Sequence, residues 1–215
     1  MPTFATYTLG CKVSQYESTA IAEELIRLGM EEVSFGEFAD AYIINTCTVT
    51  AESDAKSRKY IRRALRKNPN AIVAVMGCYS QRSPEEVAAI EGVSIVAGTA
   101  DKMKLPGMIV NLLNDASQKS IPNVITKSLD GEGFEPMCIT RPERTRAYVK
   151  IEDGCECRCT YCAIADARGP VRSKPAEDVI REVEGLYASG TREIVLTGIE
   201  TGSYGADFEE NYDLG

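Results

Sequence analysis

The sequence contains no histidine in 215 residues, although it contains eight cysteines. Without histidine, the chain cannot form a mixed cysteine–histidine zinc site or a catalytic triad with a histidine base. It also lacks an apolar run long enough to span a bilayer, and its first residues do not resemble a secretory signal. We therefore expect a cytoplasmic protein without membrane association, in which clustered cysteines serve metal or redox chemistry.

Positive charge is scarce in the last part of the chain. Residues 1–150 hold 18 Lys/Arg and 18 Asp/Glu, whereas residues 151–215 hold 6 and 14, which accounts for the whole net charge of −8. An acidic segment is a poor surface for nucleic acid, because binding depends on neutralised phosphates. Any RNA contact must then come from a local basic patch.

Apolar strands and amphipathic helices alternate along the first half of the chain. This order is typical of an α/β fold, here a doubly wound, Rossmann-like parallel sheet. A single helix is expected at 83–90 and a single strand at 146–152, where a second α/β unit begins. Residues 115–145 lose the pattern and suggest an extended linker. The predicted division is a domain at 1–114, a linker at 115–145 and an incomplete second domain at 146–215.

Three cysteines far apart in the sequence each come just after a predicted strand, namely Cys11, Cys47 and Cys78. The carboxyl ends of parallel strands line one crevice, where ligands bind. These cysteines could therefore meet at one edge of the sheet. The alternative is that they are buried structural residues, which is common for cysteine.

A second group of cysteines has the spacing C-x3-C-x2-C, at Cys155, Cys159 and Cys162. Thiolates are the ligands of iron–sulfur clusters, and three of them leave one iron of a cubane open. An open iron can bind S-adenosylmethionine, whose reductive cleavage gives a radical. The alternative is a zinc knuckle that also uses Cys157, although zinc loops prefer two separated pairs. We interpret Cys157 as a bystander, although it could be an alternative ligand, and the role of Cys138 stays open.

Six segments of the sequence resemble the radical S-adenosylmethionine methylthiotransferase family. The similarity is greatest to the branch that acts on threonylcarbamoyladenosine in tRNA, which the Gly-Cys-Lys-Val start favours. The matching segments are 8–18 (TLGCKVSQYES), 44–50 (INTCTVT), 77–81 (GCYSQ), 146–155 (RAYVKIEDGC), 167–169 (ARG) and 196–199 (LTGI). Residues 163–165 (AIA) depart from the family pattern after the last loop cysteine.

The resemblance implies two 4Fe–4S clusters and S-adenosylmethionine as cofactors. Cys155, Cys159 and Cys162 would hold the catalytic cluster, and Cys11, Cys47 and Cys78 a second one that carries the sulfur. The product would be a methylthio group on carbon 2 of the modified adenosine next to the anticodon. The implied partners are the tRNA anticodon loop and an electron donor such as a flavodoxin-type protein. Family members continue through a larger partial barrel and an RNA-binding domain, so this chain resembles a truncated member.

The resemblance also gives roles to three residues near the proposed radical site. Gly198 and Gly202, at the end of a predicted strand, would contact the amino group of S-adenosylmethionine. Tyr161 would lie near its adenine. The alternatives are an ordinary turn for the glycines and simple packing for the tyrosine.

A predicted helix at 51–67 carries seven basic residues in twelve positions. Phosphate contact is one interpretation, and a solvated helix face is the other. The candidate RNA-binding residues are Lys56, Arg58, Lys59, Arg62, Arg63, Arg66 and Lys67.

Two other functions are compatible with the same cysteines. One is a non-catalytic iron–sulfur or electron-transfer module, and the other is a zinc-bound RNA-binding fragment. Iron and sulfide analysis separates the zinc protein from both others. Formation of 5′-deoxyadenosine separates the enzyme from the electron carrier.

Overall fold

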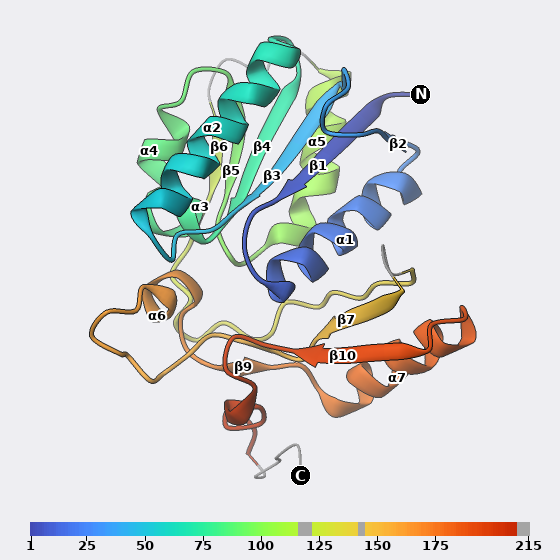
Figure 1. Ribbon diagram of the computed structural model, residues 1–215, viewed down its shortest axis with the longest axis vertical. Helices are drawn as coiled ribbons and strands as arrows, with labels where there is room; N and C mark the ends of the chain where they lie inside the picture. The colour runs from blue at the N-terminus through green and yellow to red at the C-terminus, as the bar shows by residue number, and fades with distance from the viewer. Residues whose placement is uncertain (116–121, 142–144, 210–215) are drawn as a thin grey trace. The chain divides into compact units, whose positions relative to one another are not determined.

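The computed structural model describes residues 1–115, 122–141 and 145–209 (Figure 1). Contacts between residues divide the chain into two compact units. The first comprises Met1–Gly10 and Ile21–Lys127, and the second Cys11–Ala20 and Ser128–Gly215. Each unit is described by itself below.

The first unit contains a six-stranded sheet in which every neighbouring pair is parallel. Its strands, in spatial order β2-β1-β3-β4-β5-β6, can be followed in Figure 1. They are Thr3–Thr8 (β1), Glu31–Glu32 (β2), Ala41–Thr46 (β3), Ile72–Gly77 (β4), Val93–Ala97 (β5) and Asn123–Ile125 (β6). β3, β4 and β5 are buried along their whole length, because helices cover both faces of a parallel sheet.

Alternate residues of the central strands enter two separate cores. Ile43 and Ala74 pack on the face that includes Leu25 and Ile109. Their neighbours along the same strands pack on the other face with Ile61. The period of two along each strand therefore produces a doubly wound α/β fold, which confirms the predicted fold class.

The helices connect successive strands. They are Lys12–Arg27 (α1), Ala51–Lys67 (α2), Cys78–Arg82 (α3), Pro84–Ala88 (α4) and Leu105–Asn114 (α5), the last preceded by a 3₁₀ turn at Lys102–Lys104. The helix predicted at 83–90 is present as α4, with Ser83 at its N-cap position, although it ends at Ala88, and the short helix α3 before it was not predicted. Pro84 occupies the first turn of α4, where its missing N–H leaves no helical hydrogen bond unmade.

The sheet contains two strands that the sequence did not predict. β2 consists of two exposed glutamates, and β6 has two exposed residues within the segment interpreted as a linker. Neither has the apolar alternation on which a strand prediction depends. Both are edge strands that form only because β1 and β5 offer free hydrogen-bonding groups.

In the second unit the strands are Arg146–Lys150 (β7), Glu152–Asp153 (β8), Arg172–Ser173 (β9) and Glu193–Thr197 (β10). The helices are Ile164–Arg168 (α6) and Ala176–Ala188 (α7), followed by a 3₁₀ turn at Thr201–Ser203. β7 pairs in parallel with β10, whereas β8 pairs with β9 in antiparallel. The single strand expected at 146–152 is thus divided at Ile151, whose carbonyl accepts the N–H of Lys174.

Within the described residues, no helix combines the length and the apolar character that crossing a bilayer requires.

Candidate functional site

The cysteine loop of the second unit begins directly after β8 and ends where α6 begins. All its cysteines are free thiols; Cys155 and Cys162 are half-buried and Cys159 is exposed. The N–H of Cys162 donates to the carbonyl of Cys159 at 2.9 Å, which closes one turn between these two residues. The loop therefore presents three accessible sulfur donors from a short stretch of chain.

Gly154 sets the start of this loop. Its φ is +95°, a conformation that residues with a side chain rarely adopt, and a Cβ here would lie 1.9 Å from the Pro170 carbonyl oxygen. The next residue, Cys155, donates its N–H to the carbonyl of Gly169 at 3.0 Å. The beginning of the loop is thus fixed against the segment that follows α6.

Cys157 is exposed and lies beside the thiol of Cys155. The hydrogen bond with Cys155 raises the pKa of Cys157, and Cys159 and Glu200 nearby act in the same direction. Cys157 is therefore close to the other sulfurs, and both predicted possibilities for it, a bystander or an alternative ligand, stay open.

Tyr161 is 90% exposed. A side chain this exposed is not held by packing, so the simple packing alternative was wrong. Its ring is accessible to a ligand, although its contact with an adenine stays a prediction.

Gly198 lies against a buried carboxyl group that the sequence did not single out. A Cβ on Gly198 would be 2.4 Å from Oε2 of Glu152, and the N–H of Glu200 donates to the same oxygen at 2.8 Å. Glycine is therefore required so that Glu152 can reach the backbone at the end of β10. The N–H of Gly202 donates to Oε1 of Glu200 at 3.1 Å, which makes a capped turn.

Glu152 is fully buried, and burial raises its pKa to about 7. Its Oε1 has no hydrogen-bond partner among the residues that the structure describes. The sequence signal for this residue was weak, because a glutamate before a cysteine loop has no distinctive pattern. Its role follows only from the tertiary contact with 198–200.

The chemistry of the loop fits an iron–sulfur cluster. Within the described ranges, no three Cys, Asp or Glu side chains are arranged around a single metal ion. In a cubane each thiolate binds a different iron, so its ligands need not converge on one point. Three accessible thiols on the loop that follows β8 provide the donors that such a cluster requires.

The cysteines near the N-terminus stand at ends of neighbouring strands. Cys47 follows β3 and Cys78 follows β4, and the last residues of these strands, Thr46 and Gly77, are paired. Cys11 comes after β1, whose pairing with β3 is extended by the bond from Leu9 N–H to Asn45 O at 2.8 Å. The contacts place Cys11 in the second unit and the other two in the first, so their common cluster stays a prediction.

The order of these strands is relevant to ligand binding. From β1 the chain continues to β2 on one side, whereas β3, β4 and β5 follow on the other side. In open α/β sheets, ligands bind at the carboxyl ends of the strands where the order reverses, which here is between β1 and β3. Gly10 and Cys47 lie at these two strand ends.

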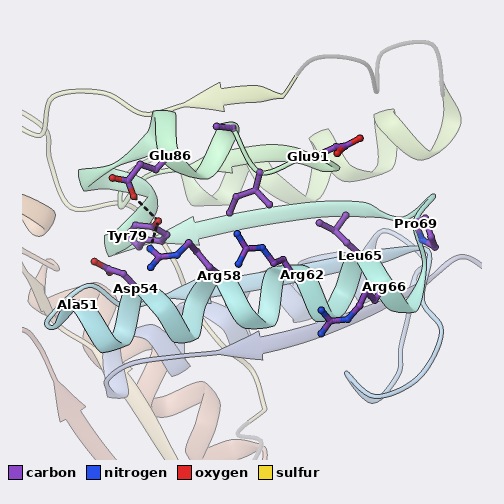
Figure 2. A pocket seen from close by; sticks show the side chains of 12 residues that line it. Ala51, Asp54, Arg58, Arg62, Leu65, Arg66, Pro69, Tyr79, Glu86 and Glu91 are labelled. Atoms are coloured by element: carbon purple, nitrogen blue, oxygen red, sulfur yellow. Dashed lines mark hydrogen bonds between the residues drawn. The ribbon is translucent and has the colours of Figure 1, made fainter.

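The basic residues of α2 form adjacent stripes along the helix. Thr50 caps the helix by accepting the N–H of Ser53, and basic residues in the last turn suit its dipole. Three arginines four residues apart, Arg58, Arg62 and Arg66, line a groove of about 1290 Å³. Figure 2 shows Arg58 and Arg62 extending from the helix toward the side that carries Glu86.

The groove is balanced in charge. Its three arginines are accompanied by three carboxylates, which belong to Asp54, Glu86 and Glu91. Arg58 donates to the hydroxyl of Tyr79 at 2.9 Å, and that hydroxyl donates to Glu86 at 2.9 Å (Figure 2). This lining is a poor match for a polyanion.

The other basic residues of α2 form a neighbouring stripe of Lys59, Arg63 and Lys67, again four residues apart. All three are exposed, and Arg63 lies over the ring of Phe35. Lys56 forms an exposed ion pair with Glu52 at 2.8 Å. The predicted RNA-binding residues thus form adjacent stripes along α2, and their contact with RNA stays a prediction.

Two family models match the chain. One, described as an uncharacterized protein family, UPF0004, covers residues 3–98, and the other, the Radical SAM superfamily, covers residues 149–213.

Several curated relatives match nearly the whole chain. A threonylcarbamoyladenosine tRNA methylthiotransferase of Bacillus subtilis is 45% identical over 98% of this chain and 46% of its own length. The protein of that name in Aquifex aeolicus is 38% identical over 96% of this chain and 50% of its own length. A tRNA-2-methylthio-N(6)-dimethylallyladenosine synthase of Clostridium perfringens is 31% identical over 98% of this chain and 48% of its own length. The chain thus spans about half the length of the curated relatives that it matches.

Proposed function

Because the chain belongs to the radical S-adenosylmethionine methylthiotransferase family, we propose that it takes part in sulfur and methyl transfer to tRNA. The proposed product carries a methylthio group on carbon 2 of threonylcarbamoyladenosine next to the anticodon. Relatives named for this nucleoside are 45% and 38% identical, whereas one named for dimethylallyladenosine is 31% identical. The observation that carries the proposal is the loop of accessible cysteines directly after β8.

Cys155, Cys159 and Cys162 are the proposed ligands of a 4Fe–4S cluster. When bound, the cluster would supply the electron that cleaves S-adenosylmethionine. The chain's own residues position this site: Gly154 allows the loop to start against 169–170, and Glu152 fixes the end of β10 beside it. Tyr161, Gly198 and Gly202 are the proposed contacts of S-adenosylmethionine.

A second cluster on Cys11, Cys47 and Cys78 is proposed as the source of sulfur. Support comes from the strand ends of β1, β3 and β4, which are consecutive in the sheet. The external electron donor and the cytoplasmic location belong to the same proposal, since the clusters need reducing conditions.

The first experiment tests the loop by single replacements. Cys155→Ala, Cys159→Ala and Cys162→Ala are reconstituted without oxygen and compared with Cys138→Ala, an exposed cysteine outside the loop. We expect the loop variants to lose iron, sulfide and 5′-deoxyadenosine formation, while Cys138→Ala keeps all three. A protein that binds only zinc would overturn the proposal, and cluster binding without S-adenosylmethionine cleavage would indicate an electron carrier.

A companion variant, Cys157→Ala, identifies the number of ligands. If only three cysteines bind the cluster, the variant keeps its iron and its cleavage activity, whereas loss of both would make Cys157 a ligand.

The substrate is tested with tRNA from a strain that lacks the modification, by mass spectrometry of the nucleosides. Methylthiolation of the dimethylallyl nucleoside alone would contradict the assignment to threonylcarbamoyladenosine.

A further inference from the structure

Five charged side chains are buried together in the second unit. Their exposed fractions do not exceed 4%, and they comprise three cations and two carboxylates: Glu17, Lys150, Asp153, Arg168 and Arg172. Burying an ionised group is costly unless opposite charges and hydrogen bonds surround it. A cluster of this kind therefore requires closely defined partners.

Glu17 is at the centre of the contacts. Nη1 of Arg168 donates to Oε1 of Glu17 at 2.6 Å, and Nη2 donates to Oε2 at 3.3 Å. Nζ of Lys150 donates to the same Oε1 at 2.9 Å. Burial alone would lower the pKa of Lys150, but Asp153 and Glu17 raise it, so the amine stays charged.

The same two cations also hold Asp153. Nζ of Lys150 donates to Oδ2 of Asp153 at 2.6 Å, and Nη1 of Arg168 lies 3.3 Å from both carboxylate oxygens. Oδ1 of Asp153 accepts the N–H of Gly154 at 3.0 Å. The carboxylate that shares its cations with Glu17 therefore holds the backbone from which the cysteine loop starts.

The network joins two cysteine-bearing segments that are distant in the sequence. Glu17 lies on α1, which begins directly after Cys11, and Asp153 lies two residues before Cys155. Arg168 is 151 residues from Glu17 and ends α6, which follows the loop. Apolar residues of similar volume would stabilise a core at least as well as buried charges do. The network is better explained by the precise geometry that charged hydrogen bonds impose.

We propose that Glu17 is a positioning residue for the cysteine loop. Through Arg168 and Lys150 it orients Asp153, and through Asp153 it fixes Gly154 and the direction in which Cys155 leaves β8. The inference rests on the proposed function, in which this loop carries the catalytic cluster. Residues that orient the ligands of a metal centre typically change its affinity or activity by about 10- to 100-fold when they are replaced.

The test compares Glu17→Gln with Glu24→Gln in the full chain. Both residues lie on α1, but Glu24 forms an ion pair with Arg27, whose side chain is exposed. Both variants are made with Cys11, Cys47 and Cys78 replaced by alanine, so that only the loop can assemble a cluster. Circular dichroism establishes folding, and iron content, the electron paramagnetic resonance spectrum with and without S-adenosylmethionine, and cleavage rate report on the loop.

We expect Glu17→Gln to fold, to give an altered resonance spectrum and to lose about ten-fold or more in cleavage rate. Glu24→Gln should match the parent, and Glu17→Asp, which keeps the charge, should restore part of the signal. A folded Glu17→Gln with the parent spectrum and rate would overturn the inference.

If Glu17→Gln does not fold, Lys150→Gln tests the inference instead. This replacement removes the ammonium group that bridges Glu17 and Asp153, and it keeps the ion pair of Glu17 with Arg168. A parent spectrum and rate in this variant would then overturn the inference, and an altered spectrum would support it. Failure of the parent itself to bind iron would instead refute the proposed function. The two failures are therefore distinguishable.

Discussion

Charged residues are used differently on α2 and in the buried network around Glu17. On α2, seven basic residues stand within twelve consecutive positions, and most of them are exposed. In the network, five charges come from distant segments and are almost completely buried. The basic residues of α2 are easily recognised in the sequence, but most of them are solvated. The charges of the network cannot be recognised as a group in the sequence, but they are joined by buried hydrogen bonds and ion pairs. Position in the fold, and not density in the sequence, decides what a charge contributes.

The largest expected effect is on stability, from removing one cation of the network. Arg168→Ala leaves Glu17 and Asp153 with fewer partners in a buried site, so we expect a loss of about 3–5 kcal/mol in the free energy of unfolding. Arg181→Ala, which breaks an exposed pair with Asp178, should cost less than about 1 kcal/mol. Urea unfolding of the cluster-free protein measures both. Equal losses of unfolding free energy in Arg168→Ala and Arg181→Ala would contradict the expected difference between buried and exposed ion pairs.

The next effect depends on pH and concerns Glu152. Its pKa is raised from 4.5 to about 7 in the folded protein, so its contribution is present below about pH 4.5 and is lost as the pH rises through 7. The stability of the native protein relative to Glu152→Gln should therefore fall between about pH 4.5 and 7. The fall should be at most about 3.5 kcal/mol, since the pKa rises by about 2.5 and each pKa unit corresponds to about 1.4 kcal/mol. If the free energies of unfolding of the native protein and of Glu152→Gln changed with pH in the same way, the raised pKa of Glu152 would be contradicted.

A smaller effect is expected at Gly198. Gly198→Ala places a methyl group 2.4 Å from the Glu152 carboxylate and should destabilise the protein by about 1–3 kcal/mol. The matched control is Gly185→Ala in α7, where nothing lies within 4 Å of the new Cβ. That replacement should stabilise the helix by up to about 1 kcal/mol, because alanine is the better helix former. Thermal unfolding should move the two variants in opposite directions.

The smallest effects on stability are expected on α2, where binding is the informative measurement. Replacing Lys59, Arg63 and Lys67 by glutamine should reduce the salt dependence of tRNA binding by about one unit of slope for each lost phosphate contact. The matching triple replacement of Arg58, Arg62 and Arg66 should reduce it less, because carboxylates face these arginines in the groove. Both triples should unfold within about 1 kcal/mol of the parent. Equal slopes for the two triples would contradict the preference for the exposed stripe.

The parts of the fold that could be predicted are those specified by local pattern. The apolar runs of β3 and β4 were recognisable because both faces of these strands are buried. The bounds of α2 were predicted correctly as 51–67, since Thr50 caps its start and Asn68-Pro69 follows its end. β2, β6 and α6 were missed, because they are short and depend on neighbours that supply their hydrogen bonds.

The candidate site divides in the same way. The spacing of Cys155, Cys159 and Cys162 and the positions of Cys11 and Cys47 after strands could be read directly. Glu152 could not be predicted, because its partners at 198–200 come into contact only after β7 and β10 pair.

The sequence by itself determined the alternation of strands and helices and the cysteine spacing, because both depend on residues close together in the chain. Only the tertiary structure decided which charges are buried and which are solvated. Glu17 is an ordinary polar residue of an amphipathic helix until Arg168, 151 positions later, donates to its carboxylate. The physical reason is that the cost of burying a charge is set by its partners in space, and sequence periodicity carries no information about partners so far away.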